Sequence, residues 1–399
     1  MERKNTFSPG HGSSQYDSVR KEHFPPGSGI AVIGAGAFGG WAALYLQRSG
    51  YKVTLVDQWG PGNSRASSGG ETRLIRCIYG INPFYTALAN RAYDLWIENE
   101  PALGGKFLYP KVCLWFSDQS ADDLVRQALP IIEKEGLQYQ CLSPEELSKY
   151  FPQIKADDCE VILEKKTGYL LARAASDAVK NLFVKEGGTY VHSPASLGEI
   201  KQGLLDAIRL GNSTELRADG FLFACGPWLR EMFPEILASQ LTITRQEVYY
   251  FGIPSKISGW YEELPTWIDH SPPDYYYGIP GGIRRGFKIA FDRRGSEVDP
   301  TSQNRSPSKD EVEKARDYIG NRFVGLEDLP LIESRVCQYA DTSDGNFIFD
   351  QHPEASNLWL LGGGSGHGYK HGPSLGELVS DSLSGKRSIP GDLRLNRDN

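Results

Sequence analysis

The sequence predicts a mixed fold, in which an α/β domain with a parallel sheet is joined to a mostly antiparallel α+β domain. Residues 29–57 have a strand–helix–strand order, which predicts parallel pairing. Two further apolar segments, 220–224 and 358–361, read as buried strands far along the chain. Between 241 and 289, segments rich in Tyr, Phe and Trp alternate with Pro and Gly turns, which indicates antiparallel strands. We therefore expect one nucleotide-binding domain assembled from three stretches of chain, with a second domain inserted twice.

Local patterns support the individual elements. Gly29–Ile33 and Tyr51–Val56 are apolar strands on either side of a helix at Ala37–Ser49. Ser143 followed by Pro144 starts a helix, because serine caps the first turn and proline fits inside it. The other expected elements are helices at 84–98, 172–186 and 309–322, a strand at 189–192, and a helix after the glycine-rich turn 362–366 that runs through Leu378.

The expected domain boundaries follow this order of segments. The nucleotide-binding domain comprises 29–105, 165–238 and 335–386, and the inserted domain comprises 106–164 and 239–334. Residues 1–28 are rich in Ser, Gly, Pro and charge, which predicts a disordered N-terminal segment, and 387–399 form a C-terminal tail.

Composition excludes several classes of partner. The chain has 399 residues, a formal net charge of −7 and a pI of about 5.6, whereas a nucleic-acid-binding protein needs a basic face. No apolar run approaches the roughly 18 residues of a membrane span, and the N-terminus lacks the apolar core of a secretory signal. The six cysteines form no CxxC pair. We therefore expect a cytoplasmic protein with reduced thiols, no structural metal and no nucleic-acid or membrane partner.

The segment from Gly34 to Gly39 is a GxGxxG motif between a strand and a helix. Gly34 permits the tight turn, Gly36 lets the backbone approach a pyrophosphate, and Gly39 lets the helix pack closely on the strand. Asp57 ends the second strand, where an acidic residue binds ribose hydroxyls. The motif alone does not separate FAD from NAD. However, a polar Ser/Gly loop at 63–70 and an arginine-rich strand follow in place of further βαβ repeats, which favours a flavin lying across the domain boundary.

Six blocks carry a family resemblance: VIGAGAFGG (32–40), GGETRLIRCIYG (69–80), FACGPW (223–228), YYGIPGGIRRGFKIAFD (276–292), RVCQYADTSDGNFIFDQHPE (335–354) and GGGSGHGYKHG, which ends at Gly372. In this order they resemble the monomeric sarcosine oxidase and N-methyl amino acid oxidase family, part of the wider D-amino acid oxidase superfamily. The resemblance implies an FAD-binding Rossmann-like domain of the glutathione reductase type, built from three segments, and an inserted, mostly antiparallel substrate domain.

The resemblance also assigns roles around the flavin. Cys337 stands where the family joins a cysteine to the flavin 8α-methyl group, and neighbouring Arg335 favours the thiolate that this chemistry needs. The glycine-rich turn is expected to place a helix N-terminus near the flavin pyrimidine. The expected cofactor contacts are completed by Ser67, Arg73, Gly364, Gly366, His367, Gly368 and Lys370.

On the substrate side, the resemblance gives Arg76 and Lys370 the carboxylate of an amino acid, because a planar guanidinium suits two carboxylate oxygens and an ammonium adds a point charge. Arg73 approaches the flavin, and Lys288 activates oxygen by stabilising developing negative charge. Tyr277 and Tyr339 match pocket tyrosines. Read alone, each cation is also compatible with a solvated surface, and each tyrosine with the core.

One position departs from the family. Asp292 stands where these oxidases usually have a histidine, four residues after Lys288. A carboxylate there can hold a cationic amine or hydrogen-bond a polar substrate, or it can point to solvent beside Arg293 and Arg294. This departure puts sarcosine itself in doubt.

The predicted function is an FAD-dependent amine oxidase that converts a secondary or cyclic amino acid to an imine and reduces oxygen to hydrogen peroxide. The alternatives are an oxidase of fructosyl amino acids, a biosynthetic imino-acid oxidase, a flavin dehydrogenase that passes electrons to a carrier, and a catalytically silent flavoprotein. The family is largely monomeric, so we expect a monomer whose partners are a small amino acid and oxygen.

Overall fold

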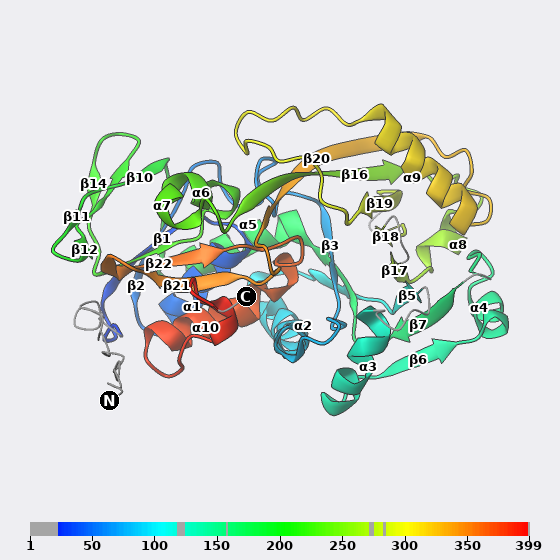
Figure 1. Cartoon of the computed structure of the whole chain (residues 1–399), viewed down its shortest axis with the longest axis horizontal. Coiled ribbons are helices and arrows are strands. Elements are labelled where there is room, and N and C mark those ends of the chain that lie inside the picture. Colours follow the sequence, from blue (N-terminus) through cyan, green and yellow to red (C-terminus); the bar gives the residue numbers. More distant parts are fainter. Residues whose placement is uncertain (1–22, 118–123, 157–158, 271–274, 282–284, 398–399) are drawn as a thin grey trace, which may run out of the picture.

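The computed structural model describes residues 23–117, 124–156, 159–270, 275–281 and 285–397. Two large sheets stand at opposite ends of the molecule, with strand β3 (Thr72–Ile75) running between them (Figure 1). Within the described residues, no helix has the length and apolar character needed to cross a bilayer.

The first sheet is a six-stranded, largely parallel sheet. Its order is β21 (Ile348–His352), β22 (Ala355–Gly362), β15 (Gly220–Phe223), β1 (Gly29–Ile33), β2 (Lys52–Asp57) and β9 (Thr189–His192), with only the β21–β22 pair antiparallel. Alternate residues of β1 enter different cores: Ile30 and Val32 pack with the helices on one face, whereas Ala31 and Ile33 pack with Phe233 on the other. Burial on both faces explains the continuous apolar runs of these strands.

Four helices cover one face of this sheet, and small elements cover the other. The helices are α1 (Ala37–Arg48), α2 (Pro83–Leu103), α5 (Ala172–Lys185) and α10 (Gly372–Leu383). The smaller elements are β10 (Ala195–Leu197), β11 (Ile200–Lys201), β12 (Leu204–Leu205), β13 (Ile208–Leu210), β14 (Glu215–Leu216), η1 (Gly226–Trp228), α6 (Leu229–Met232) and α7 (Pro234–Leu237).

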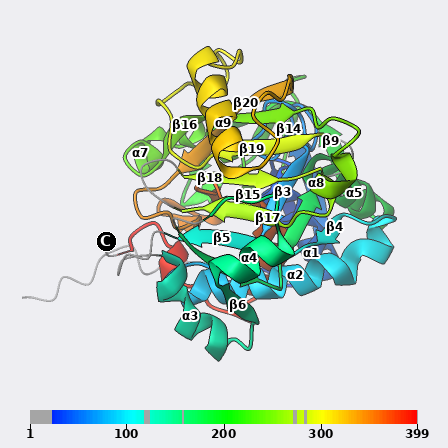
Figure 2. The same cartoon turned by 90° about the vertical axis from the view of Figure 1, so that its right-hand side faces the viewer.

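The second sheet has eight strands and is antiparallel except for one pair. Its order is β20 (Leu331–Asp341), β16 (Thr242–Phe251), β19 (Phe287–Phe291), β18 (Tyr276–Ile279), β17 (Thr266–Asp269), β5 (Cys113–Ser117), β7 (Glu160–Glu164) and β6 (Tyr139–Leu142), with β17 and β5 parallel. Helix α9 (Lys309–Arg322) lies across it and buries Val312, Ala315 and Ile319 (Figure 2). The helices α3 (Leu124–Lys134), α4 (Pro144–Tyr150) and α8 (Ser258–Glu262) complete this part.

Strand β3 belongs to a three-stranded sheet in the order β3, β8 (Gly168–Leu171) and β4 (Leu108–Pro110). The structure thus confirms the predicted fold class, a parallel nucleotide-binding sheet drawn from distant segments together with a largely antiparallel sheet. The capping box that Ser143 and Glu146 form at the start of α4 agrees with the helix start read from the sequence.

The predicted N-terminal boundary needs a correction. Residues 1–22 lie outside the described residues, but 23–28 already pack on the first sheet. Phe24 is 3% exposed, its backbone N–H donates to Leu383 O at 3.0 Å, and its ring lies 5.1 Å from that of Trp359. The buried Phe24 ring, together with backbone hydrogen bonds from Gly27 to Gly50 and from Lys52 to Ser28, thus orders a segment whose composition predicted disorder.

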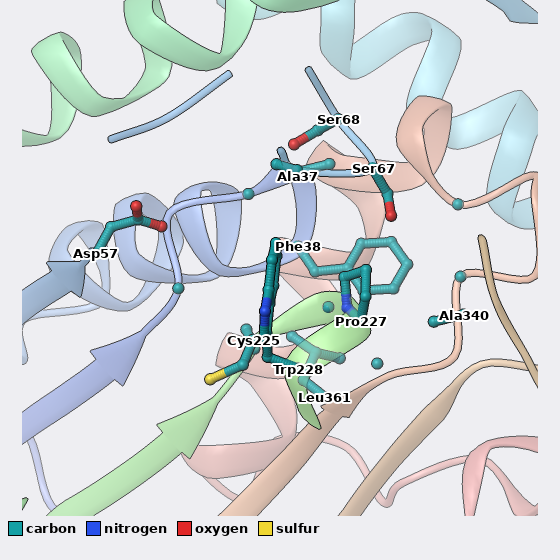
Figure 3. A pocket seen from close by; sticks show the side chains of 18 of the residues that line it. Ala37, Phe38, Asp57, Ser67, Ser68, Cys225, Pro227, Trp228, Ala340 and Leu361 are labelled. Atoms are coloured by element: carbon teal, nitrogen blue, oxygen red, sulfur yellow. The ribbon is translucent and has the colours of Figure 1, made fainter. Parts of the chain in front are cut away.

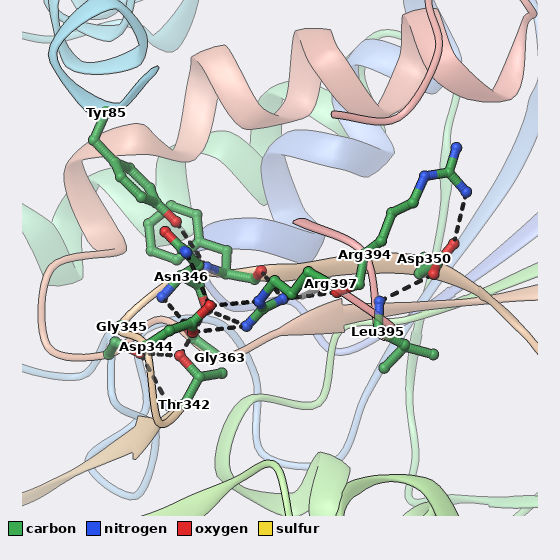
Figure 4. Close-up of polar contacts among 12 residues, drawn as sticks. Tyr85, Thr342, Asp344, Gly345, Asn346, Asp350, Gly363, Arg394, Leu395 and Arg397 are labelled. Carbon is green, nitrogen blue, oxygen red and sulfur yellow. Dashed lines mark hydrogen bonds and ion pairs between the residues drawn. The ribbon is translucent and has the colours of Figure 1, made fainter. Parts of the chain in front are cut away.

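The C-terminal tail also packs against the domain (Figure 4). After the turn η4 (Gly391–Leu393), Leu395 N donates to Asp350 Oδ2 at 3.0 Å. Arg397 forms a two-pronged ion pair with Asp344, with Nε–Oδ2 2.6 Å and Nη2–Oδ1 2.9 Å, and also donates to Phe347 O. The tail therefore holds the loop that follows β20.

Replacing Arg397 with alanine is expected to lower the free energy of unfolding by about 2 kcal/mol. The Arg397 side chain is only 12% exposed and that of Asp344 23%, so the variant leaves a half-buried carboxylate without its partner. Chemical denaturation measures the change. Arg387→Ala, at an exposed position of the same tail, is the control and should shift stability by less than about 0.5 kcal/mol. Equal losses of stability in both variants would show that the Arg397–Asp344 ion pair does not stabilise the fold.

Candidate active site

A long cavity lies at the carboxyl ends of β1, β2, β15 and β22, where open parallel sheets bind their ligands. It encloses about 1210 Å³ of empty space, its open mouth included. Asp57 lies at one side, and Ser67 and Ala340 lie at the opposite side (Figure 3). The cavity therefore extends from the nucleotide-binding motif toward the second sheet.

The glycines of the motif fit a dinucleotide. Gly34 has φ +106°, and a Cβ there would lie 2.4 Å from Ala224 O; a Cβ on Gly39 would lie 1.9 Å from Gly34 O. Gly36 has room, since the nearest atom to its Cβ position is Ser68 Oγ at 3.6 Å. It caps α1 without a side-chain hydrogen bond, which leaves the first-turn N–H groups available to a phosphate.

Asp57 closes this end of the cavity. Its carboxylate accepts hydrogen bonds from Ala35 N at 2.7 Å, Trp59 N at 2.9 Å and Gly60 N at 2.7 Å. A carboxylate has about four acceptor positions, so capacity remains for a ribose hydroxyl. The glycines and Asp57 together suit the ADP half of a dinucleotide.

At the opposite end, Ser67, Arg73, Tyr339 and Gly366 line the cavity. Arg73 donates to Ser67 O at 2.7 Å and Thr72 O at 2.9 Å. Cys337 lies directly behind Ser67, with its Sγ 3.7 Å from Ser67 O, but it is not among the described residues that line the cavity.

The glycine-rich turn between β22 and α10 contributes Gly362, Gly364, Gly366, Gly368 and Tyr369 to the wall. Gly366 has φ +76°, and a Cβ there would lie 2.7 Å from the Tyr339 ring. The predicted helix does not follow directly. A single 3-10 turn, η3 (Tyr369–His371), comes first, and α10 begins at Gly372.

A second cavity, with about 1170 Å³ of empty space when its open mouth is included, adjoins the first and shares Arg73, Gly366 and Tyr369 with it. It brings together several residues predicted from distant parts of the sequence: Arg76, Tyr277, Asp292, His367 and Lys370. Tyr339 lines only the first cavity, and Lys288 is not among the described lining residues of either.

Two cations mark one wall of the second cavity. The Arg76 guanidinium carbon lies 4.4 Å from the Tyr79 ring centre and 5.1 Å from that of Trp115. Lys370 is 5% exposed, and its Nζ donates to Tyr79 Oη and His367 O, both at 2.8 Å. Burial, reinforced by Arg76, lowers the pKa of Lys370 well below its usual value. In the described part of the chain neither cation has a carboxylate within ion-pair distance, so both remain available to an anionic ligand.

Lys288 is deeply buried in β19. It is 1% exposed, its Nζ donates to Thr72 O at 2.9 Å, and it lies 5.3 Å from the Tyr277 ring centre. Burial, together with Arg73, lowers its pKa well below the usual value. Burial also raises the pKa of Tyr277 to about 12 and that of Tyr339 well above its usual value. Lys288 thus lies behind Arg73 and Tyr277, both of which face the second cavity.

Asp292 faces the second cavity, with an Arg294 nitrogen 3.7 Å from its Oδ1. The side chain itself is 46% exposed. Burial within the surrounding chain raises the pKa of Asp292, against the opposing effect of Arg294. Arg294 also pairs with Asp341 at 2.9 Å and donates to Ser365 O at 3.0 Å. This acid therefore belongs to the cavity wall in the structure.

Sequence reasoning did not identify several residues of the second cavity. Tyr79 lies within a quoted block, and its hydroxyl bridges Lys370 Nζ and His371 Nε2, the latter at 2.7 Å. Trp115 comes from β5, for which no element was expected from the sequence. The expectation of no metal site rested on finding no HxxxH spacing among the histidines, and that reading was wrong, because His367 and His371 form such a pair. Among the described residues, no group of three His, Cys, Asp or Glu side chains is placed to hold a metal ion.

The fold and these two cavities are those of a dinucleotide-binding enzyme, in which the cofactor cavity adjoins a ligand cavity lined by cations. Residues 29–382 match the model of the DAO family, described as FAD dependent oxidoreductase. The chain therefore belongs to this family, and its cofactor is FAD.

Individual relatives agree with this assignment. The chain is 27% identical over 376 residues to the monomeric sarcosine oxidase of Arthrobacter sp. (strain TE1826), which covers 92% of this chain and 94% of the relative. It is 28% identical over 377 residues to the peroxisomal sarcosine oxidase of Homo sapiens, covering 91% and 93%. A modified fructosyl peptide oxidase from Aspergillus nidulans has a similar structure, with a TM-score of 0.80, 18% identity and coverage of 94% and 95%. That last likeness concerns the fold alone.

Proposed function

We propose that this protein is an amine oxidase that oxidises the C–N bond of a secondary or cyclic amino acid and passes the electrons to oxygen, forming hydrogen peroxide. The observation that carries the proposal is the Arg76–Lys370 pair. These two cations face a cavity beside the cofactor cavity and have no carboxylate partner among the described residues.

In this proposal the chain's own residues bind and orient the substrate. Arg76 and Lys370 hold the carboxylate, and the Tyr79 and Trp115 rings fix the plane of the Arg76 guanidinium. Tyr277, whose hydroxyl stays protonated because burial raises its pKa to about 12, packs beside the substrate. Bound FAD supplies the two-electron acceptor. The imine is released and hydrolyses in water.

Asp292 favours a second candidate substrate. A carboxylate on the cavity wall, next to Arg294, provides hydrogen-bond acceptors and donors for a hydroxyl-rich or cationic group on the substrate nitrogen. A fructosyl amino acid carries such a group, and the fructosyl peptide oxidase of similar fold is named for a related substrate. A peroxide assay in air over sarcosine, other N-methyl amino acids, proline, pipecolate and fructosyl amino acids separates these substrates. Substrate-dependent flavin bleaching without peroxide would instead support a dehydrogenase.

We further propose that Cys337 would hold the flavin through a thioether to its 8α-methyl group. This C–S bond would replace the thiol S–H and one methyl C–H, and the flavin ring itself would take up the two electrons. Its Sγ lies 3.7 Å from the carbonyl oxygen of Ser67, which lines the cofactor cavity. Acid precipitation of the holoenzyme is expected to leave the yellow colour in the pellet, whereas Cys337→Ser should release it to the supernatant. Cys225→Ser is the matched control, because Cys225 also lines this cavity but should leave the attachment intact. Complete release of flavin from the unmodified protein would exclude the bond.

A further inference from the structure

Glu164, the last residue of β7, is a buried acid that the proposed chemistry does not use. It is 2% exposed. Its Oε1 accepts a hydrogen bond from Cys77 N at 2.5 Å, and its Oε2 accepts one from Trp115 Nε1 at 2.8 Å. A buried carboxyl group with hydrogen bonds on both oxygens has a fixed orientation.

Both hydrogen-bond partners of Glu164 are next to Arg76, one in the chain and the other in space. Cys77 follows Arg76 directly in the chain, and the Trp115 ring centre lies 5.1 Å from the Arg76 guanidinium carbon. Glu164 therefore fixes the backbone just after Arg76 and the aromatic ring beside its side chain. Arg76 in turn faces the second cavity. This chain of contacts runs from a buried acid to a cavity-lining cation.

In the described part of the chain, Glu164 has no cation paired with it. The titratable groups that interact with it electrostatically are Arg76, Cys77, Tyr79, Cys113 and Lys370. None of the described cations lies within ion-pair distance of it. Burial raises the pKa of Glu164 to about 7, although the hydrogen bonds from Cys77 and Trp115 and the charge of Arg76 oppose this shift. Protonated and ionised forms therefore coexist near neutral pH.

We propose that Glu164 is a positioning residue for Arg76 that takes up a proton when a carboxylate binds beside Arg76. This inference rests on the proposed function, in which Arg76 and Lys370 hold a carboxylate. The bound anion adds a negative charge near Glu164, and a like charge favours the neutral acid. The proton comes from solvent and forms an O–H bond on the Glu164 carboxyl group, with no other bond made or broken.

The sign of the pH dependence follows from linkage. Since the bound state holds more protons on Glu164 than the free state, carboxylate affinity must fall as pH rises through the range near 7. Below that range Glu164 is already protonated and affinity is highest. Acetate is a suitable probe because it carries a carboxylate but no titrating amine.

The experiment is calorimetric titration of the holoenzyme with acetate, in pairs of buffers that differ in ionisation enthalpy. The unmodified protein should take up protons near pH 7, and its Kd for acetate should rise about tenfold between about pH 6 and about pH 8. Glu164→Gln, which imitates the neutral acid, should show clearly smaller values of both effects near pH 7, and any remainder belongs to Lys370, whose pKa is lowered by burial. The KM for an amino acid should follow the same pH profile, whereas kcat should not, because Glu164 lies behind Arg76 and Trp115.

Glu247→Gln is the matched control. Glu247 is another carboxylate that is largely covered, with its side chain 9% exposed, and it accepts hydrogen bonds from Arg245 and Tyr249 in β16. It should keep the pH profile of the unmodified protein. An unmodified protein that takes up no protons, or a Glu164→Gln variant that retains the full uptake, would overturn the inference. Unchanged acetate binding by Arg76→Gln would instead contradict the proposed function itself.

Discussion

Replacing Arg76 with glutamine is expected to reduce kcat/KM for an amino acid substrate about a thousandfold, roughly 4 kcal/mol of lost binding. The guanidinium lies between the Tyr79 and Trp115 rings, with both centres within 5.1 Å, so its fork has a fixed plane. A carboxylate can then accept two parallel hydrogen bonds. Glutamine offers two donors on a single nitrogen and no charge, and it leaves Lys370 as the only cation. Steady-state kinetics on the best substrate of the panel measure the effect.

A comparison of variants separates charge from geometry. Arg76→Lys keeps the charge but not the planar fork, so an intermediate loss of about tenfold to a hundredfold is expected. Arg126→Gln, at a 45% exposed arginine that pairs with Glu160, controls for the removal of an arginine elsewhere and should leave the kinetics unchanged. Flavin content should be unaffected in all three. If Arg76→Gln changes KM by less than threefold, which is about the 0.6 kcal/mol scatter of a neutral substitution, the carboxylate site lies elsewhere.

The nucleotide-binding half of the site was predictable because its signals are local. The turn of Gly34 and Gly39 and the acid at Asp57 lie within one strand–helix–strand unit, and a short window of sequence contains the whole pattern. The pairing of Arg76 with Lys370 had no such local signal, because the two residues lie near opposite ends of the chain. Only the family resemblance connected them in the sequence, and the fold places both in one cavity.

The rest of the cavity had no sequence signal of its own. Trp115 lies in the strand CLWFS, where every residue is buried, so hydrophobic alternation cannot show which side chain faces a ligand. Glu164 is the end of an ordinary strand until Trp115 and Cys77 are placed around it. The same burial on both faces explains Lys288. Its neighbours Phe287 and Ile289 are buried too, so all of β19 is covered and alternation could not tell a surface lysine from a functional one.

The small elements between 195 and 216 went unpredicted for a related reason. Strands β10 to β14 are two or three residues long and largely exposed or half-buried, so they carry neither apolar periodicity nor length. Helix α3 contains Pro130, which lowers helix propensity, and it is held by the buried side chains Val125, Ala128 and Ile132. Tertiary packing, which a single sequence does not show, decides such segments.

Replacing Lys288 with methionine is expected to slow the reaction of the reduced enzyme with oxygen by about a hundredfold to a thousandfold, with little change in the rate of flavin reduction by substrate. Lys288 is 1% exposed, and its Nζ has only the Thr72 carbonyl as a hydrogen-bond acceptor among the described residues. Burying an ammonium without a carboxylate is unfavourable, and no contact of Lys288 within the described structure offsets this desolvation. A buried cation that does not stabilise the fold is consistent with a catalytic role, in which it stabilises negative charge developing on oxygen.

The unfolding temperature and the pH dependence of the oxygen reaction distinguish a catalytic role of Lys288 from a structural one. Because methionine fills a similar volume without a charge to desolvate, Lys288→Met should not lower the unfolding temperature. Burial and Arg73 lower the pKa of Lys288 well below its usual value, so the cationic fraction falls as pH rises through that lowered pKa. The oxygen reaction of the unmodified enzyme should therefore slow at high pH, and that of Lys288→Met should not respond to this ionisation. Stopped-flow measurements of reduction without oxygen, and of reoxidation after mixing with oxygen, give the two rates separately. Equal slowing of both steps would show that Lys288 acts on the whole site and not on oxygen.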